Sequence, residues 1–179
     1  MEAPRFLPHY TYDEYVHWEG RWELIEGIPF AMSPSPRPKH QRITSAISAE
    51  FHFALKKCKS CHVYDPLDYK ISDETVLQPD ILVVCGPIDG PFLDRAPELI
   101  VEVLSPATAS KDKLYKLNVY QDQGVPYYLV VDVDKETIQV LQLQNGKYEF
   151  VVTNGHSFEF AFAFTHECSV RIDFNEIWS

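Results

Sequence analysis

Residues 78–106 read QPDILVVCGPIDGPFLDRAPELIVEVLSP, and two aliphatic runs in this stretch have the length and β-branched content of buried strands. The segment between them, residues 86–97, is rich in glycine and proline and predicts a loop. Each run also carries a carboxylate, since Asp80 opens the first and Glu102 lies inside the second. A buried carboxylate is costly unless it is paired, protonated or bound to a metal ion. The two acids therefore predict a chemical site in the core.

The side chain of Glu102 is expected on one particular face of its strand. Alternation along residues 98–105 puts it beside Ile100 and Leu104, and gives the opposite face to Leu99, Val101 and Val103. Asp80 is the expected companion, because consecutive strands usually lie side by side. Two carboxylates brought together repel each other, and a divalent cation stabilises such a pair. Hard carboxylate oxygens suit Mg²⁺ or Mn²⁺, so Asp80 and Glu102 are the predicted metal ligands.

A helix is predicted directly after the Glu102 strand. Residues 110–123 follow cap-forming serine and threonine residues and end at a glycine. Asp112, Lys116 and Tyr120 are four residues apart along it and share one face. Lys116 could orient or deprotonate a water molecule, or stabilise charge on a phosphate oxygen. Asp112 is more simply explained as a helix-start charge that pairs with Lys116.

The other elements follow from local patterns. A capping box predicts a short helix in residues 11–20, and Glu26-Gly27 predicts a hairpin. Apolar residues four apart predict a helix from Pro38 to about Lys57. Asn145-Gly146 predicts a second hairpin. Strands are expected at 62–71, 76–85, 97–104, 125–133 and, strictly alternating, 157–164. This order predicts an α/β fold, a mixed sheet flanked by helices with hairpins at both ends, formed by residues 1–179 as a single domain.

Composition limits the partners. The formal net charge is -10, from 26 Asp and Glu against 16 Lys and Arg, which disfavours sequence-blind binding to nucleic acid. Basic clusters at 37–42, 56–59 and 111–116 could form a local contact face, or could simply face solvent. No apolar run is long enough to cross a membrane, and the first residues lack the pattern of a signal peptide. The expected location is the cytoplasm, without membrane association.

Four cysteines need an account: Cys58, Cys61, Cys85 and Cys168. The segment CKSCH at 58–62 has the spacing of covalent haem attachment, but the chain has only two methionines and no export signal to support it. A zinc site is disfavoured because no second CxxC or HxxxH exists. The spacing is therefore interpreted as chance, and a redox or metal-storage protein is kept as a rival.

These motifs together resemble the PD-(D/E)XK nuclease superfamily, in particular its branch of small stand-alone proteins classed as restriction endonucleases and largely of unknown function. The resemblance rests on Pro79-Asp80, on Glu102 in an E-x-L strand and on a following D-x-x-x-K-x-x-x-Y helix. The segments stand in the branch's order along nearly the whole chain: WELIEG, MSPSPRPKHQ, QPDILVV, ELIVEVLSP, KDKLYKLNVY and GVPYYLVVD.

The resemblance implies a restriction-endonuclease-like core with the order αβββαβ and Mg²⁺-dependent hydrolysis of DNA phosphodiesters, with Asp80 and Glu102 as metal ligands. The superfamily's lysine normally stands two residues after the second acid, where this chain has Leu104. The role would then pass to Lys116 on the helix, with Lys113 as the alternative. If neither lysine reaches the metal, the domain would be an inactive one that binds nucleic acid or another protein.

Two further residues are candidates for the same site. Glu23 shares a strand face with Ile25 and could add a carboxylate, although a solvated glutamate is an equal alternative. His40, near the start of the long helix, could be a metal ligand, a proton acceptor or a phosphate contact, or only a surface histidine. Cutting both strands of a duplex needs two active sites, so a homodimer is expected, with a terminal hairpin or the FEFAFAF strand as its contact surface. A smaller phosphoester substrate also remains open.

Overall fold

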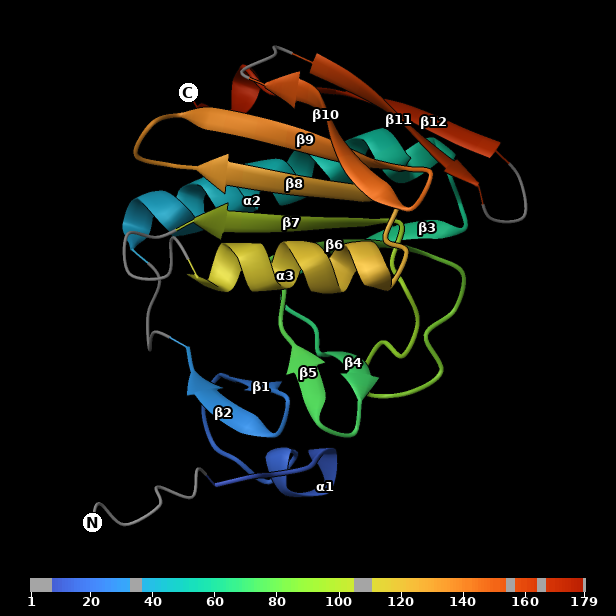
Figure 1. Cartoon of the computed structure of the whole chain (residues 1–179). Helices are drawn as coiled ribbons and strands as arrows, with labels where there is room; N and C mark the ends of the chain where they lie inside the picture. The colour runs from blue at the N-terminus through green and yellow to red at the C-terminus, as the bar shows by residue number, and fades with distance from the viewer. Residues whose placement is uncertain (1–7, 33–36, 105–110, 154–156, 164–166, 179) are drawn as a thin grey trace.

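A six-stranded mixed sheet forms the centre of the computed structural model, which describes residues 8–32, 37–104, 111–153, 157–163 and 167–178. Its strand order is β10-β9-β8-β7-β6-β3 (Figure 1). Only β7 and β8 pair in parallel, and the other neighbours are antiparallel. The bounds are β3 Cys61–Tyr64, β6 Ile81–Cys85, β7 Leu99–Leu104, β8 Tyr127–Asp132, β9 Thr137–Gln144 and β10 Lys147–Thr153.

Two helices cover opposite faces of this sheet. Helix α2, Pro38–Ala54, continues into a short 3₁₀ turn and packs Ile43, Ile47 and Phe51 on one face. Helix α3, Lys111–Asp122, packs on the other face, where Tyr120 joins the core. The order α2, β3, β6, β7, α3, β8 is the predicted αβββαβ core. The α/β fold class is therefore confirmed.

The period-two prediction for β7 also holds. Leu99, Val101 and Val103 lie in the core under α2, and Ile100 lies in the core under α3. Glu102 follows the same alternation, because it bonds to side chains of α3. Alternation therefore delivers this carboxylate to the helix that follows its own strand.

A second, four-stranded sheet corrects the strand predictions. Its order is β2-β1-β5-β4. The predicted strands 62–71 and 76–85 are each divided between the two sheets, as β3 and β4 and as β5 and β6. Both divisions fall at a proline, Pro66 or Pro79, whose missing N–H interrupts a ladder of hydrogen bonds. The bounds are α1 Tyr12–Tyr15, β1 Trp22–Ile25, β2 Ile28–Ala31, β4 Tyr69–Ser72 and β5 Thr75–Leu77.

A C-terminal hairpin corrects one predicted surface. Strand β11, Ser157–Ala163, pairs with β12, Glu167–Asp173, a strand that the sequence patterns did not predict, and a 3₁₀ turn at Glu176–Trp178 follows. The aromatic face of the FEFAFAF strand is not available to a second copy, because Phe160 and Phe162 are buried in the core. The Phe160 ring centroid lies 5.4 Å from that of Phe51 on α2. This alternation therefore encodes intramolecular packing.

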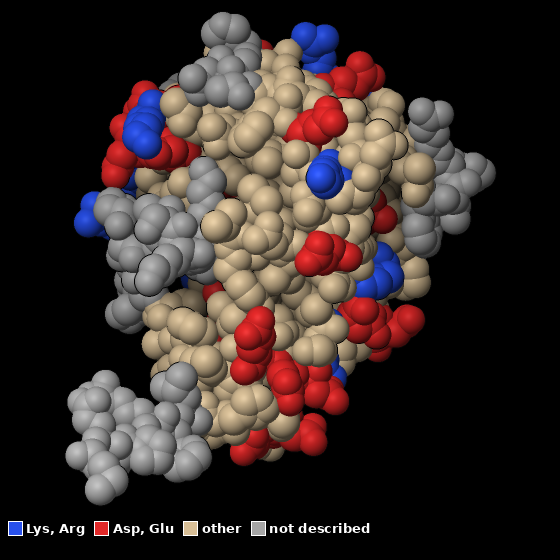
Figure 2. Space-filling view, viewed as in Figure 1, with Lys and Arg blue, Asp and Glu red and all other residues tan. Residues whose placement is uncertain are grey.

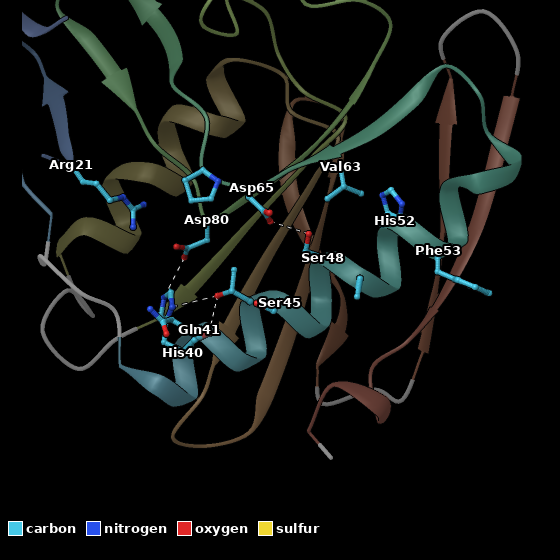
Figure 3. A pocket seen from close by; sticks show the side chains of 13 residues that line it. Arg21, His40, Gln41, Ser45, Ser48, His52, Phe53, Val63, Asp65 and Asp80 are labelled. Atoms are coloured by element: carbon cyan, nitrogen blue, oxygen red, sulfur yellow. Dashed lines mark hydrogen bonds and ion pairs between the residues drawn. The ribbon is translucent and has the colours of Figure 1, made fainter. Parts of the chain in front are cut away.

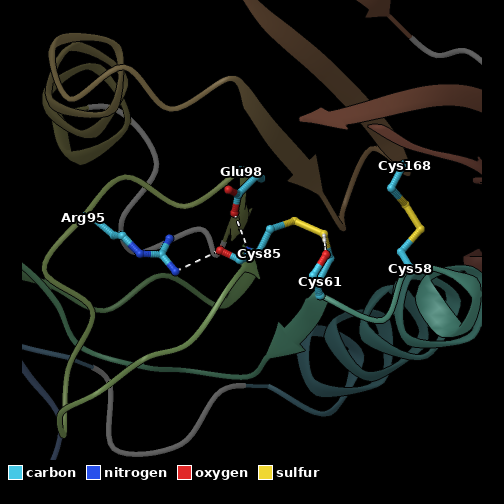
Figure 4. Close-up of a disulfide and its surroundings, with 7 residues drawn as sticks. Cys58, Cys61, Cys85, Arg95, Glu98 and Cys168 are labelled. Atoms are coloured by element: carbon cyan, nitrogen blue, oxygen red, sulfur yellow. Dashed lines mark hydrogen bonds between the residues drawn. A yellow bond between two sulfur atoms is a disulfide. The ribbon is translucent and has the colours of Figure 1, made fainter. Parts of the chain in front are cut away.

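The cysteines form two disulfides, Cys58–Cys168 and Cys61–Cys85 (Figure 4). The first joins the end of α2 to the C-terminal hairpin across 110 residues of sequence, and the second joins the paired strands β3 and β6. Interpreting the CKSCH spacing as chance missed both bonds, because each of its cysteines bonds to a distant one. A disulfide sulfur is not a thiolate ligand, so neither haem attachment nor a zinc site fits this arrangement.

No helix within the described ranges is long and apolar enough to span a membrane.

Candidate active site between β6, β7 and α3

Asp80 lies where the pairing of β6 with β7 stops. The ladder ends at Ile81 opposite Val101, and Pro79 lies two residues before Ile81, beyond the end of the ladder. The backbone N–H of Val103 therefore lacks a strand partner, and it donates to Asp80 Oδ2 at 2.8 Å. Asp80 is 8% exposed. The ladder thus ends before Pro79, and the Asp80 carboxylate replaces a strand carbonyl as the acceptor for Val103. This hydrogen bond holds the carboxylate beside β7.

Lys116 forms ion pairs with two carboxylates on the face of the main sheet that α3 covers. Its Nζ lies 2.8 Å from Glu23 Oε1 and 3.1 Å from Glu102 Oε1. The lysine side chain is only 5% exposed, as is that of Glu23, and that of Glu102 is 12% exposed. Tyr120, one turn further along α3, donates its hydroxyl to Glu102 Oε1 at 2.8 Å. The predicted face of α3 therefore does meet the Glu102 strand, whereas the side chains of Asp112 and Lys113 lie outside the described residues.

Glu23 reaches this cluster from the second sheet. It is 4% exposed on β1, so it is not the solvated glutamate that was the alternative. Besides Lys116, its Oε1 accepts a hydrogen bond from the backbone N–H of Gln78 at 2.9 Å. Gln78 stands directly before Pro79-Asp80. The bond therefore ties the small sheet to the segment that positions Asp80.

His40 approaches Asp80 from helix α2. Its Nε2 donates to the carbonyl of Val103 at 2.9 Å and lies 3.6 Å from Asp80 Oδ2. The pKa of His40 is raised, chiefly by its hydrogen bond to Asp80 and against the opposing effect of burial. His40 is therefore part of the cluster and not a surface histidine.

The pKa of Glu102 is raised to about 7. Burial is the largest cause, because it penalises the charged form. The positive charge of Lys116 opposes this effect, whereas the negative charges of Asp80 and Glu23 add to it. A cation placed between Asp80 and Glu102 would relieve their mutual repulsion.

The donor set fits a hard divalent cation with an incomplete protein shell. Within the described ranges, no group of three or more His, Cys, Asp or Glu side chains is arranged to hold a metal ion. The cluster holds three carboxylates, and Glu23 is engaged by Lys116 and by the backbone of Gln78. Asp80 and Glu102 are the two that the sequence analysis predicts as metal ligands. Mg²⁺ commonly binds to one or two carboxylates and completes its shell with water and substrate oxygens.

Comparison with known proteins identifies the family of this chain. A family model described as "Uma2: Putative restriction endonuclease" matches residues 12–170, from α1 into β12. The chain belongs to the Uma2 family. The match includes all five candidate residues, and it confirms the resemblance to the restriction-endonuclease-like branch of the PD-(D/E)XK superfamily. Among curated proteins, none matches this Uma2 chain.

A solved structure shares the fold of this Uma2 domain. It is the crystal structure of "a putative nuclease belonging to DUF820" from Anabaena variabilis ATCC 29413. The two chains are 19% identical and superpose with a TM-score of 0.71, over 94% of this chain and 97% of that one. At this identity the likeness concerns the fold, and it extends over the hairpins as well as the core.

A pocket of about 840 Å³ opens along helix α2, beside the cluster that contains Asp80 and His40 (Figure 3). Asp80, His40 and Arg21 lie at one end, and His52 and Phe53 lie at the other. The sequence analysis did not single out Arg21, although it directly precedes the quoted WELIEG segment. Its position two residues before Glu23 was the available signal, but only the tertiary structure brings it beside Asp80.

The surface charge of the Uma2 domain is predominantly acidic, as its composition requires. Figure 2 shows acidic side chains gathered on the part of this face that holds α1 and the small sheet. Lysine and arginine side chains are scattered over the face that Figure 2 shows, and no continuous basic band crosses its described part.

Proposed function

We propose that this protein is a metal-dependent endonuclease that hydrolyses phosphodiester bonds of DNA. The observation that carries the proposal is the contact between Lys116 and Glu102, with Nζ 3.1 Å from Oε1. It gives the cluster two acids and a lysine even though the usual lysine position holds Leu104. The family description and the nuclease title of the Anabaena protein support the same reaction class.

Asp80 and Glu102 would hold Mg²⁺ or Mn²⁺. Their known contacts within the described part of the chain use Asp80 Oδ2 and Glu102 Oε1. Their other oxygens, Oδ1 and Oε2, are the ones we assign to the cation. Such a cation supplies Lewis-acid chemistry, since it polarises a phosphoryl oxygen.

Lys116 is assigned to stabilising charge on the phosphate. It is paired with two carboxylates, which favours its cationic form, and a cationic amine cannot accept a proton. Glu23 positions Lys116 from the opposite side. His40 is assigned to a phosphate contact, because it lines the pocket beside Asp80 and its pKa is raised.

A second candidate function is a silent domain of the same fold that binds nucleic acid or protein without cutting. Two observations favour it. The charge of Lys116 is already matched by Glu23 and Glu102, and the described residues include no ready-made group of three metal-binding side chains. A chain that has lost catalysis would retain the same ion pairs for stability alone.

Quaternary structure and location belong to the proposal as well. We propose that residues 1–179 act as one domain and that two copies pair, since cutting both strands requires two sites. With the aromatic face of β11 buried, the edge strand β10 is the contact we favour, because Phe150 on it is 62% exposed. The cytoplasm stays the proposed location, although the two disulfides weigh against it, because disulfides are rare in reducing compartments.

The test is cleavage of supercoiled plasmid and of a single-stranded oligonucleotide in Mg²⁺ or Mn²⁺. Glu102→Gln and Lys116→Ala should abolish cutting. Glu98→Gln is the matched control, because Glu98 is a half-buried acid that bonds to the backbone of Cys85 at the other end of β6. Calorimetric titration with Mg²⁺ is run in parallel. Metal binding without cutting would point to another phosphoester, and loss of both would favour the silent domain.

A further inference from the structure

Arg21 is held rigidly at the end of the pocket next to Asp80. Its Nε donates to Gln78 Oε1 at 2.7 Å. Gln78 Nε2 in turn donates to Asp68 Oδ1 at 3.0 Å, and the hydroxyl of Tyr15 donates to the same oxygen at 3.0 Å. One side of the guanidinium is therefore fixed by a chain of hydrogen bonds that runs back through the small sheet to α1.

One terminal nitrogen of the guanidinium has no partner among the residues that the structure describes. Arg21 Nη2 is buried and has no hydrogen-bond partner within the described part of the chain. A buried donor without a partner is costly, and more so when it carries charge, so such an atom calls for an acceptor from outside. Arg21 lines the same pocket as Asp80 and His40, and Figure 3 shows the three side chains together at one end. A phosphate oxygen is the acceptor that best matches a guanidinium.

The rest of the pocket is not built for a phosphate backbone. Apart from histidines, Arg21 is the one basic residue among the described residues that line it, and Asp65 adds a negative charge. The wall formed by α2 is mostly neutral and polar, with Gln41, Thr44, Ser45 and Ser48. Side chains of this kind contact sugars and base edges. A duplex held along its backbone would instead require several cationic contacts.

An exposed aromatic ring stands at the far end. Phe53 is 71% exposed on α2, and Lys56 Nζ lies 4.6 Å from its ring centroid. Bases of single strands stack on such rings without regard to sequence. The exposed ring of Phe53, beside a pocket in which Arg21 can bind one phosphate, fits this mode of binding.

We propose that Arg21 binds one phosphate of a single-stranded nucleic acid, which lies along α2 with a base stacked on Phe53. The inference rests on the proposed function and names the form of its substrate. It places the anchored phosphate at the Asp80 end of the pocket, next to the bond that would be cut. A duplex would enter only where its strands are separated.

The test measures binding and does not depend on cutting. A fluorescein-labelled single-stranded oligothymidylate is titrated with the full chain in Ca²⁺ at several salt concentrations, and anisotropy gives the affinity. Arg21→Gln should weaken binding about tenfold and reduce the slope of log affinity against log salt by about 0.7, the value for one single-strand phosphate contact. Arg21→Lys should keep the slope. Phe53→Ala should weaken binding by about 5- to 150-fold and leave the slope unchanged.

Arg95→Gln is the matched control, because Arg95 bonds to the carbonyls of Cys85 and Pro87, at the far end of β6. The inference is overturned if Arg21→Gln behaves like this control, if a matched duplex binds as tightly as the single strand, or if the unmodified chain binds neither. Glu102→Gln separates the two proposals. If binding depends on Arg21 but no cutting is detected, only the proposed nuclease activity is refuted. If cutting depends on Glu102 but Arg21→Gln does not change binding, only this inference is refuted.

Discussion

Lys116 on α3 reaches Glu102 on β7 and Glu23 on β1, and so one buried amine connects the main sheet to the small one. The strand and the helix follow each other in the chain, but Glu23 lies far earlier in the sequence. The lysine thus has a structural partner and a partner at the proposed metal site. Stability and activity should respond differently when these partners are removed one at a time.

Lys116→Gln should lower the free energy of unfolding by about 3–5 kcal/mol, because it leaves buried carboxylates without a countercharge. The double variant with Glu23→Gln should recover part of this loss, since one of those charges is then gone. Cleavage should remain absent in both variants. Chemical denaturation of the two single variants and the double variant gives the coupling free energy between Lys116 and Glu23. A double-variant loss equal to the sum of the two single-variant losses would contradict a shared network.

Metal affinity should rise with pH through about 7. Below that value the carboxyl of Glu102, whose pKa is raised to about 7, keeps its proton, and a cation must compete with it. Mg²⁺ titration calorimetry on either side of neutrality measures the effect. The pKa of His40 is also raised by its hydrogen bond to Asp80, so His40→Gln is measured alongside. The pH dependence should persist in His40→Gln and disappear in Glu102→Gln; the reverse result would assign the titration to the histidine.

The same carboxyl should make the metal-free protein less stable as pH rises. The ordinary pKa of Glu102 is 4.5, and the folded-state value is about 7. Between these values the folded state binds more protons than the unfolded state, so the contribution to stability is full below about 4.5 and is lost by about 7. Thermal melts across this range should show the trend in the unmodified chain and a weaker one in Glu102→Gln.

Tyr120→Phe should impair cutting by about tenfold while costing only about 1 kcal/mol of stability. Its hydroxyl donates to Glu102 Oε1 at 2.8 Å, and losing that bond frees the carboxylate to rotate. Tyr148→Phe is the matched control, because the Tyr148 hydroxyl donates to the Val125 carbonyl, also at 2.8 Å, without touching the cluster. Similar losses of cutting in both variants would mean that packing, and not orientation of Glu102, is responsible.

Reduction should lower the stability of the protein without changing its fold. The Cys58–Cys168 bond closes 110 residues of chain, and a loop of that size predicts a loss of about 5 kcal/mol from the entropy of the unfolded state. Thermal melts with and without reductant measure this. Thiol counting under denaturing conditions, on protein trapped rapidly from its cells, should find none if the bonds form there; four free thiols would support a reducing cytoplasm.

The sequence by itself determined the core elements and their order. Apolar spacing defined α2, alternation put Glu102 on the α3 side of β7, and Asn145-Gly146 marked the turn between β9 and β10. These are local signals, because backbone periodicity alone decides which face a side chain occupies. Two acids and a lysine spaced along consecutive elements were therefore predictable as neighbours.

Only the tertiary structure decided the rest. It brought Glu23 to Lys116 and placed Arg21 beside Asp80. It also paired the four cysteines and buried the aromatic face of β11. Each of these contacts joins residues far apart in the chain, and no local pattern specifies such a partner, because it depends on how the two sheets and the hairpin pack together.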